Sequence, residues 1–488
     1  MRDKIVLTII VSAMLVLTIL YCKEPEPVIA DSTDLSKYDY FDLLFLKNEN
    51  PQLQGDITSM CWGDPIIYVL VDKVIEGPLT YYIRDKNKEI IDHRTSDFSE
   101  DVFIEGYQVV LYKPSIDIMH IDVEPTSFEN MCNKDDHDEM CISRTTFNNI
   151  SYGTYIQGRG NSSWQGTNKQ SFSLRFSRRT RLVNDWQDHK SYNLVSMTFD
   201  RTLLKGLMFN KLAEDMGFLY QPKMKLVVLI INSEYHGIYL LTTKMSVDSK
   251  RIALTPGEML IRFDPPDTDD AIPYKSSTWI SDDDSKPTFE LLYPEYYSSE
   301  IRELAKSRVQ SAISSIEDVT SSNYLNYIDL DNIARHYLIQ EVSMNYDALS
   351  RSIYAYWRDD KLYYGPIWDM DLTLGETFEK YNMLWVYPKR LYVKHIGFYT
   401  ALWHHPEFVE KVKNLYKSEV RGECYALLNY ANNIKGLIAE DAEMNFRQYT
   451  QNSNIGAITY KGSDYITYTD SMLEFYKQRL EFLDKIFL

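Results

Sequence analysis

The order of hydrophobic patterns along the 488 residues constrains the fold more than any other feature of the sequence. Between residues 66 and 119, runs such as IIYVLVDKV and DVFIEGYQVVLY are rich in β-branched and aromatic residues, which is typical of β-strands. Beyond residue 288, apolar residues recur at helical intervals, as in SEIRELAKSRVQSAISSIED and LDNIARHYLIQEVSMNY, and Asp329 or Asp331 is placed to cap the latter helix. Strands followed by helices predict the α+β class.

The same patterns predict the domain organisation. Short, closely spaced strands indicate a small β-sandwich-like domain over residues 41–114. We expect a larger domain of two lobes over residues 115–488, of which 115–262 form a mixed β-rich lobe and 288–488 a helical lobe. Residues 263–287 are rich in Pro, Asp and Ser and predict a long exposed acidic loop between the lobes. Two helices have well-defined buried faces, with Leu203, Leu204, Met208, Leu212 and Met216 in the first and Ile301, Leu304, Ala305, Val309, Ala312, Ile313 and Ile316 in the second.

The N-terminus has the pattern of an export signal. Arg2 and Lys4 precede an uncharged stretch that ends at Cys22, and this stretch is close to the ~18 apolar residues that can also span a bilayer. We therefore expect residues 1–22 to be a signal peptide or a membrane or lipid anchor, and residues 23–40 to be a linker. The expected location is extracytoplasmic, either anchored to a membrane at the cell surface or secreted.

The overall charge of the chain favours some classes of binding partner over others. A formal net charge of −18 disfavours nucleic acid, because binding to a phosphate backbone depends on Lys and Arg. An acidic surface instead favours basic proteins or peptides, or serves solubility alone. The sequence leaves the oligomeric state open.

The cysteines do not form a disulfide framework. Cys132 and Cys141 flank NKDDHDEM, and we expect either a local disulfide or two free thiols there rather than a metal site, because no standard ligand spacing is present. Cys61 and Cys424 are interpreted as buried apolar residues.

Asp369 and Asp371 in GPIWDMDLTLG lie two residues apart, directly after an apolar run. In an extended strand their carboxylates project to one side, where like charges repel unless a cation lies between them. This pattern predicts a metal site, with a solvated turn as the alternative. Upstream, SIYAYWRDDKLYYGPIW predicts a hairpin with its turn at residues 358–361.

The hairpin predicts where a third carboxylate lies. If Trp357 pairs with Leu362, continued antiparallel register places Ser352 opposite Ile367 and Asp347 alongside Leu372. Asp347 then converges with the Asp369–Asp371 pair. Kinase-type phosphotransferases use this order of a catalytic Asp, a metal ligand five residues later, a short hairpin and a metal-binding Asp.

Candidate phosphate ligands lie in GRGNSSWQGTNKQSFSLRF. Lys169 and Arg175 alternate with apolar residues, so we expect them to share one face of a strand and to point into a cleft. Arg159 lies between Gly158 and Gly160, in a turn whose backbone could approach a phosphate.

Four ordered segments resemble the CotH kinase family of atypical secreted kinases: GRGNSSWQGTNKQSFSLRF, NLVSMTFDRTLLKGLMFNKLAEDMGF, VVLIINSEYHGIYLLTTK and NYDALSRSIYAYWRDDKLYYGPIWDMDLTLG. The resemblance runs from about residue 115 to the C-terminus. It implies an atypical protein-kinase-like fold that uses ATP with Mg²⁺ or Mn²⁺ to phosphorylate serine in protein substrates rich in basic residues. It also implies Asp347 as the catalytic residue, Asp369 as a metal ligand with Asp371 in support, and Lys169 with Arg159 near the phosphates. From the strand pattern and the kinase layout we add Lys169 as a second catalytic residue, Arg175 as an ATP ligand and Ser352 as a metal ligand.

The sequence therefore favours an exported kinase that phosphorylates serine or threonine in extracytoplasmic proteins. The alternative is a catalytically inactive surface-binding or adhesion protein that retains the fold, and the feature that favours it is Ser352, where the kinase layout has Asn. A third hypothesis is a metal-dependent nucleotidyl- or glycosyltransferase, because such an enzyme could also use two closely spaced aspartates.

Overall fold

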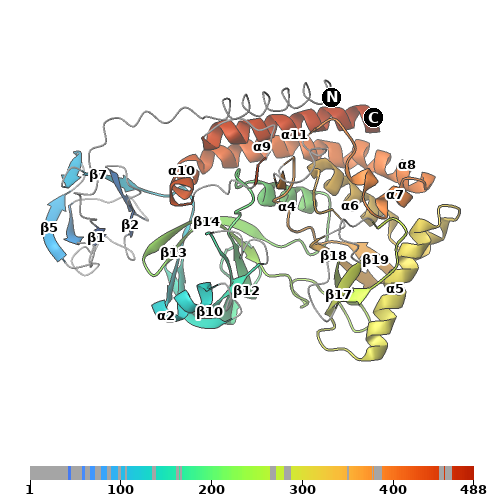
Figure 1. Ribbon diagram of the computed structural model, residues 1–488, viewed down its shortest axis with the longest axis horizontal. Helices are drawn as coiled ribbons and strands as arrows, with labels where there is room; N and C mark the ends of the chain where they lie inside the picture. Colours follow the sequence, from blue (N-terminus) through green and yellow to red (C-terminus); the bar gives the residue numbers. More distant parts are fainter. Residues whose placement is uncertain are drawn as a thin grey trace, which may run out of the picture.

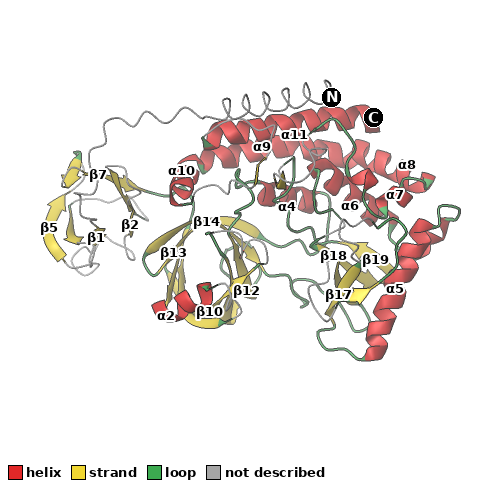
Figure 2. Cartoon of the chain, viewed as in Figure 1, coloured by secondary structure: helices red, strands yellow, loops and turns green. Residues whose placement is uncertain are grey.

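The computed structural model contains both helices and strands, which confirms the predicted α+β class. Figure 2 shows how the two are distributed. The structure describes residues 42–44, 58–60, 66–71, 78–84, 90–96, 100–104, 107–133, 139–160, 164, 168–263, 271–279, 287–348, 351–375, 377–378, 387–449, 455–456 and 464–488.

Two small sheets form the N-terminal part of the described chain and lie at one end of the molecule (Figure 1). Aliphatic and aromatic residues predominate in their longer strands, such as IIYVL and YQVVLY. One sheet has the order β1–β4–β5 and the other β2–β3–β7–β6. Their bounds are β1 (Asp42–Leu44), β4 (Leu79–Arg84), β5 (Ile90–Ser96), β2 (Thr58–Met60), β3 (Ile66–Leu70), β7 (Tyr107–Tyr112) and β6 (Val102–Ile104).

A closed seven-stranded barrel follows, in the order β10–β11–β12–β14–β13–β8–β9. The alternation in β11 explains its two faces, because Phe172, Leu174 and Phe176 are buried in the barrel core while Arg175 is exposed. The barrel strands are β8 (Ile118–Val123), β9 (Met140–Phe147), β10 (Ile150–Arg159), β11 (Ser171–Thr180), β12 (His189–Val195), β13 (Met224–Ile231) and β14 (Glu234–Thr243); the helix α2 (Pro125–Cys132) packs on β9 and β10.

A five-stranded sheet has the order β16–β17–β15–β18–β19, and its strand β16 lies within the segment where the acidic loop was expected. The prediction of a long exposed loop over 263–287 is corrected in its described part, because Ile272 pairs with Phe289 and Tyr274 is buried. The predicted lobes also divided this sheet, because most of β15 lies in residues 115–262 whereas β17, β18 and β19 lie in residues 288–488. The strands are β16 (Ile272–Pro273), β17 (Thr288–Tyr293), β15 (Met259–Phe263), β18 (Ile353–Arg358) and β19 (Lys361–Tyr364).

Helices make up most of the remaining described chain, and Figure 1 shows α9, α10 and α11 above the barrel and α5 along the five-stranded sheet. Asp329 caps α6 by accepting a hydrogen bond from the Asn332 N–H, so the first of the two expected caps is confirmed. The expected buried position of Leu304 is wrong, because its side chain is 45% exposed. The helices are α4 (Lys205–Asp215), α5 (Ser299–Glu317), α6 (Leu330–Ser343), α7 (Tyr399–Leu402), α8 (Pro406–Leu415), α9 (Arg421–Leu437), α10 (Ala439–Gln448) and α11 (Tyr465–Phe487), with a π-helical turn at Tyr416–Val420 and a short pairing of β20 (Thr377–Phe378) with β21 (Ile455–Gly456).

Two hydrophobic cores hold these elements together. One fills the barrel, and the other joins the five-stranded sheet to the helices. The helix α4 lies between barrel strands in the sequence but belongs to the second core, where all five apolar residues expected on its buried face are indeed buried. The second core therefore spans segments more than 200 residues apart in the sequence.

Several predictions concern residues outside the described part, namely the signal or anchor at 1–22, the linker at 23–40, and Cys61. Among the described residues, no helix is both long enough and apolar enough to span a membrane. Cys132 and Cys141 are free thiols in this structure, the second of the two expected states, and Cys424 is buried as expected.

Candidate active site

The hairpin that precedes the aspartate pair has the predicted register. Trp357 pairs with Leu362, and the turn residues Asp359 and Asp360 have φ of 50° and 58°. Asp tolerates this left-handed conformation better than most residues, which explains the two consecutive aspartates at the turn.

The predicted extension of this register to Ser352 and Ile367 is wrong. The strand pairing ends at Ala355 and Tyr364, and the Ile367 N–H bonds instead to the Gln221 side chain at 2.8 Å. Pro366 has no N–H to continue the ladder, and Ser352 has φ of 54°, which is not an extended conformation.

The segment that carries Asp347 nevertheless returns to the aspartate pair. The Tyr346 N–H donates to the Leu372 carbonyl at 3.0 Å, and the Leu374 N–H donates to the Ser343 carbonyl at 2.8 Å. These backbone bonds hold the residues after α6 beside the residues after Asp371. The predicted proximity of Asp347 to Leu372 is therefore confirmed.

Three further carboxylates lie near enough to Asp371 for their charges to act on it, and we call Asp200, Asp347, Asp369 and Asp371 the carboxylate group. Burial raises the pKa of Asp371 well above its ordinary value, and the nearby charges of the other three raise it further. A carboxylate in this environment is stabilised by a cation. Asp369 is exposed and has φ of 61°, so it projects from a left-handed turn of the backbone.

The carboxylate group fits a hard divalent cation by the chemistry of its donors, because Mg²⁺ prefers carboxylate oxygens. Within the described ranges, no three His, Cys, Asp or Glu side chains are grouped closely enough to hold a metal ion by themselves. This is compatible with Mg²⁺ chemistry, since Mg²⁺ is usually bound by one or two carboxylates together with phosphates of the substrate. Ser352 directly precedes β18 and is partly buried.

Lys205 and Asp200 were not identified from the sequence as site residues. The Lys205 ammonium donates to the Asp371 backbone carbonyl at 3.2 Å, and burial lowers the pKa of Lys205 to about 8 although Asp200 and Asp371 are near. Asp200 accepts bonds from Thr202 and from the Lys205 N–H, so it fixes the start of α4 against the carboxylate group. Both residues lie in the second segment of the CotH-like pattern, and that was the one sequence signal that could have identified them.

Arg159 lies beside the carboxylate group, as expected for a phosphate ligand. Its guanidinium carbon is 5.6 Å from the centre of the Trp368 ring, directly before Asp369 in the chain. Burial lowers the pKa of Arg159, while the charge of Asp369 opposes this shift. Arg159 is thus within electrostatic range of a predicted metal ligand.

The expectation that Lys169 and Arg175 point into one cleft is corrected, because Lys169 is 4% exposed and precedes β11. The Lys169 ammonium donates to the Ile238 carbonyl and to Asn445 Oδ1, the latter at 2.7 Å, and it lies 4.8 Å from the centre of the Tyr239 ring. Burial lowers the pKa of Lys169 well below its ordinary value. Its ammonium is therefore held by protein groups from β14 and α10.

A buried ion pair supports the segment that contains Asp347. Glu341, near the end of α6, pairs with Arg479 of α11 at 2.5 Å, and both side chains are fully buried. Glu341 also accepts bonds from the N–H groups of Tyr392 and Lys394 at 2.6 and 2.9 Å. These contacts fix the end of α6, from which Asp347 follows.

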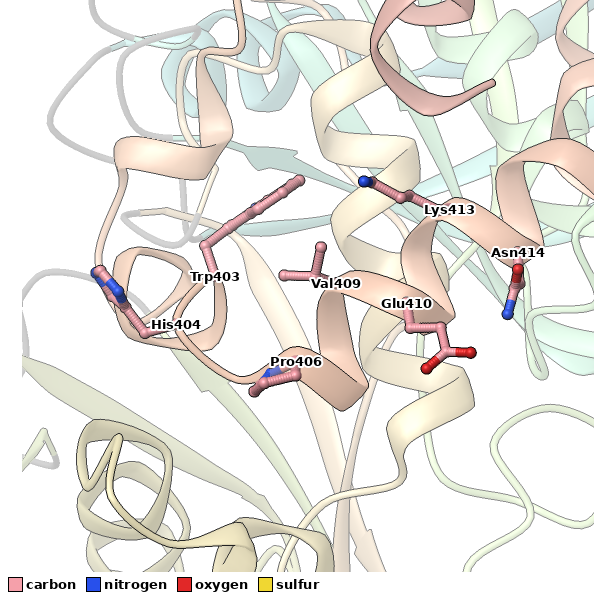
Figure 3. A pocket seen from close by; sticks show the side chains of 7 residues that line it. All are labelled: Trp403, His404, Pro406, Val409, Glu410, Lys413 and Asn414. Carbon is pink, nitrogen blue, oxygen red and sulfur yellow. The ribbon is translucent and has the colours of Figure 1, made fainter.

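A surface hollow beside α7 and α8 is a separate feature (Figure 3). Trp403 and Val409 form its apolar part, and Lys413 and Glu410 lie on its rim. None of its lining residues belongs to the carboxylate group, so we do not include it in the candidate active site.

The comparison with known proteins identifies one family that matches this chain. The family model described as CotH kinase protein matches residues 156–483, which is more than half of the chain and includes the whole carboxylate group. No curated protein matches the chain significantly.

Proposed function

The chain belongs to the CotH kinase family, and from this premise we propose that it is an exported atypical kinase that transfers the γ-phosphate of ATP to serine or threonine of extracytoplasmic proteins. The observation that carries the proposal is the interaction of Asp371 with Asp347 and Asp369. Phosphoryl transfer needs a negatively charged metal site and a carboxylate near the acceptor hydroxyl, and this arrangement offers both.

Each residue has a proposed role. Asp347 orients the acceptor hydroxyl and accepts its proton, and Asp369 and Asp371 hold Mg²⁺ or Mn²⁺ with Ser352 as a weaker ligand. Such an ion supplies positive charge that offsets the charge of the nucleotide phosphates. Arg159 binds a phosphate oxygen next to Asp369, and Lys205 positions Asp371 from the buried side.

The proposal extends to architecture, location and substrate. The barrel with its flanking elements and the helical part act as the two lobes of a kinase-like fold. Residues 1–22 direct export or tether the protein to a membrane, and the net charge of −18 favours a protein substrate rich in basic residues.

An inactive surface-binding protein is the second candidate, and one observation favours it. Ser352 is a shorter ligand than the Asn of the kinase layout. In that case the N-terminal sheets would carry the binding function.

The decisive experiment is phosphorylation with labelled ATP and Mn²⁺, followed by mass spectrometry of the labelled residue. We expect the wild-type protein to phosphorylate itself or a basic Ser-containing peptide, and Asp369→Asn to lose at least ~100-fold in rate, the scale of a lost electrostatic contact in a transition state. Asp360→Asn is the matched control, because Asp360 is also exposed and left-handed, with φ of 58°.

Both variants should unfold at the wild-type temperature, since Asn tolerates the left-handed conformation. A wild-type protein that neither transfers phosphate nor gains thermal stability with ATP and Mn²⁺ would refute the kinase proposal in favour of the inactive scaffold. A transferred nucleotidyl or glycosyl group would instead identify the third enzyme class.

A further inference from the structure

Lys244 lies next to Arg175 on the outer face of the barrel. Arg175 of β11 pairs with Ser191 of β12, and the Lys244 N–H donates to the Ser191 carbonyl at 3.2 Å. The two basic residues therefore flank Ser191 from neighbouring strands. Both are exposed, whereas Phe176 and Thr243, which adjoin them in the sequence, are buried.

Arg159 completes a group of cations, which we call the basic group: Arg159, Arg175 and Lys244. Partial desolvation lowers the pKa of Lys244, and the positive charges of Arg159, Arg251 and Arg175 lower it further. These cations therefore lie close enough together to repel one another.

Ion pairs do not neutralise the basic group among the described residues. In the part of the chain that the structure describes, no ion pair to an acidic side chain is formed by Lys244, Arg175 or Arg159. Arg251, by contrast, lies 3.9 Å from Asp248 and donates to the Lys244 carbonyl. Three neighbouring cations with no ion pair among the described residues are unexpected in a chain with net charge −18, and a bound anion would relieve their repulsion.

Arg159 links the basic group to the carboxylate group. Arg159 interacts with Asp369 on one side and with Lys244 on the other. A ligand that contacts a metal ion at Asp369 and also reaches Lys244 must carry several negative charges in a row. A nucleotide polyphosphate has this chemistry.

We propose that Lys244 binds the phosphate chain of the nucleotide together with Arg159 and Arg175, and thereby fills the role that the sequence pattern suggested for Lys169. This inference rests on the proposed kinase function for the identity of the ligand. The ammonium of Lys169 is already bound by Ile238 and Asn445, whereas Lys244 is exposed. Lys244 lies directly after β14, so its position is fixed by the barrel.

The test compares Lys244→Met with Lys250→Met in isothermal titration calorimetry of the full chain. Lys250 is the matched control, because it is also exposed and near Lys244 in the sequence but lies 3.6 Å from Asp188. The probes are Mn²⁺–ATP and, without metal, inorganic tripolyphosphate. We expect Lys244→Met to weaken binding of both probes roughly 10- to 100-fold, the loss typical of one charge-assisted contact, and Lys250→Met to change it less than about twofold.

Lys244→Arg should restore most of the affinity, because it keeps the positive charge. Equal affinities of the wild type and Lys244→Met for both probes would overturn the inference, and so would a wild type that binds neither probe. Tripolyphosphate binding that depends on Lys244, in a protein that does not transfer phosphate from ATP, would uphold the anion site and refute the kinase proposal alone.

Discussion

At the scale of single residues, left-handed backbone conformations gather around the candidate active site. Met344, Ser352, Asp369 and Leu374 have φ between 49° and 61°, and none is a glycine. Each such residue costs about 1 kcal/mol or more and persists only where its surroundings enforce it. Backbone bonds such as that from the Leu374 N–H to the Ser343 carbonyl supply part of this constraint.

Ser352 allows a direct test of the metal site. Ser352→Asn should raise Mn²⁺ affinity in the presence of ATP several-fold, because the longer amide side chain reaches further and is the ligand of the kinase layout. Ser352→Ala should lower it. The measurement is a Mn²⁺ titration followed by thermal shift.

Ser233→Asn separates this effect from the backbone preference of Asn for left-handed conformations. Ser233 has φ of 63° and lies in the turn between β13 and β14. Both Asn variants should gain similar small amounts of stability, but only the one at Ser352 should gain metal affinity. Equal metal responses of the two would contradict the role of Ser352.

At the scale of elements, α6 connects the core to the candidate active site. Asp329 caps its first turn, its middle is buried in the helical core, and its last turn carries Glu341. The Glu341 carboxylate joins α6 to α11 through Arg479, and it joins α6 to the segment at Tyr392 by accepting a hydrogen bond from the Tyr392 N–H. The position of Asp347 thus depends on a helix more than 100 residues away in the sequence.

Arg479→Met should therefore destabilise the protein by about 3–5 kcal/mol, because it leaves the Glu341 carboxylate buried without its partner. Urea unfolding measures the loss. Lys477→Met on the same helix is the control, since Lys477 is exposed and should change stability by less than about 0.5 kcal/mol. A small effect of Arg479→Met would show that the ion pair is not needed to hold α11 on α6.

At the scale of the whole molecule, the N-terminal sheets are attached to the larger domain by a mixed interface. Tyr68 and Tyr112 of these sheets pack in one apolar cluster with Ile230 of the barrel and Met444 of α10. In the same interface Asp441 accepts a hydrogen bond from the Tyr112 hydroxyl at 2.5 Å and another from the Ser115 N–H at 3.0 Å. Asp441 is fully buried, so its charge bears on the stability of this junction.

The junction should respond to pH through Asp441. Burial raises the pKa of Asp441 to about 6, against about 4 for an unfolded aspartate. A raised carboxyl pKa means that the folded state binds the proton more tightly. The stability from this group is therefore fully present below pH ~4 and is lost as the pH rises through about 6, by up to ~3 kcal/mol.

Asp441→Asn should remove this dependence, because the amide stays neutral and its oxygen can still accept from Tyr112. Thermal unfolding should find the variant close to the wild type near pH 4 and more stable above pH 6. The neighbouring Glu440→Gln is exposed and should show no such crossover. A constant difference at all pH values would exclude Asp441 as the titrating group.

The sequence by itself determined the structural features that depend on local residue patterns. The helical periodicity of α4, the cap at Asp329 and the hairpin register at Trp357 and Leu362 were all predicted, because each depends on neighbouring residues. The proximity of Asp347 to Leu372 was also predicted, but the backbone bonds of Tyr346 and Leu374 bring these segments together rather than continued pairing of the hairpin. The family resemblance was confirmed over residues 156–483.

Only the tertiary structure determined which groups the long polar side chains contact. Lys169 meets Asn445, which lies 276 residues further along the chain, and Lys205 meets Asp371 166 residues away. Alternation along a strand gives the side of a sheet on which a residue lies, but not what faces that side. A buried lysine needs nearby acceptors, and these come from elements whose positions are set by packing of the whole core.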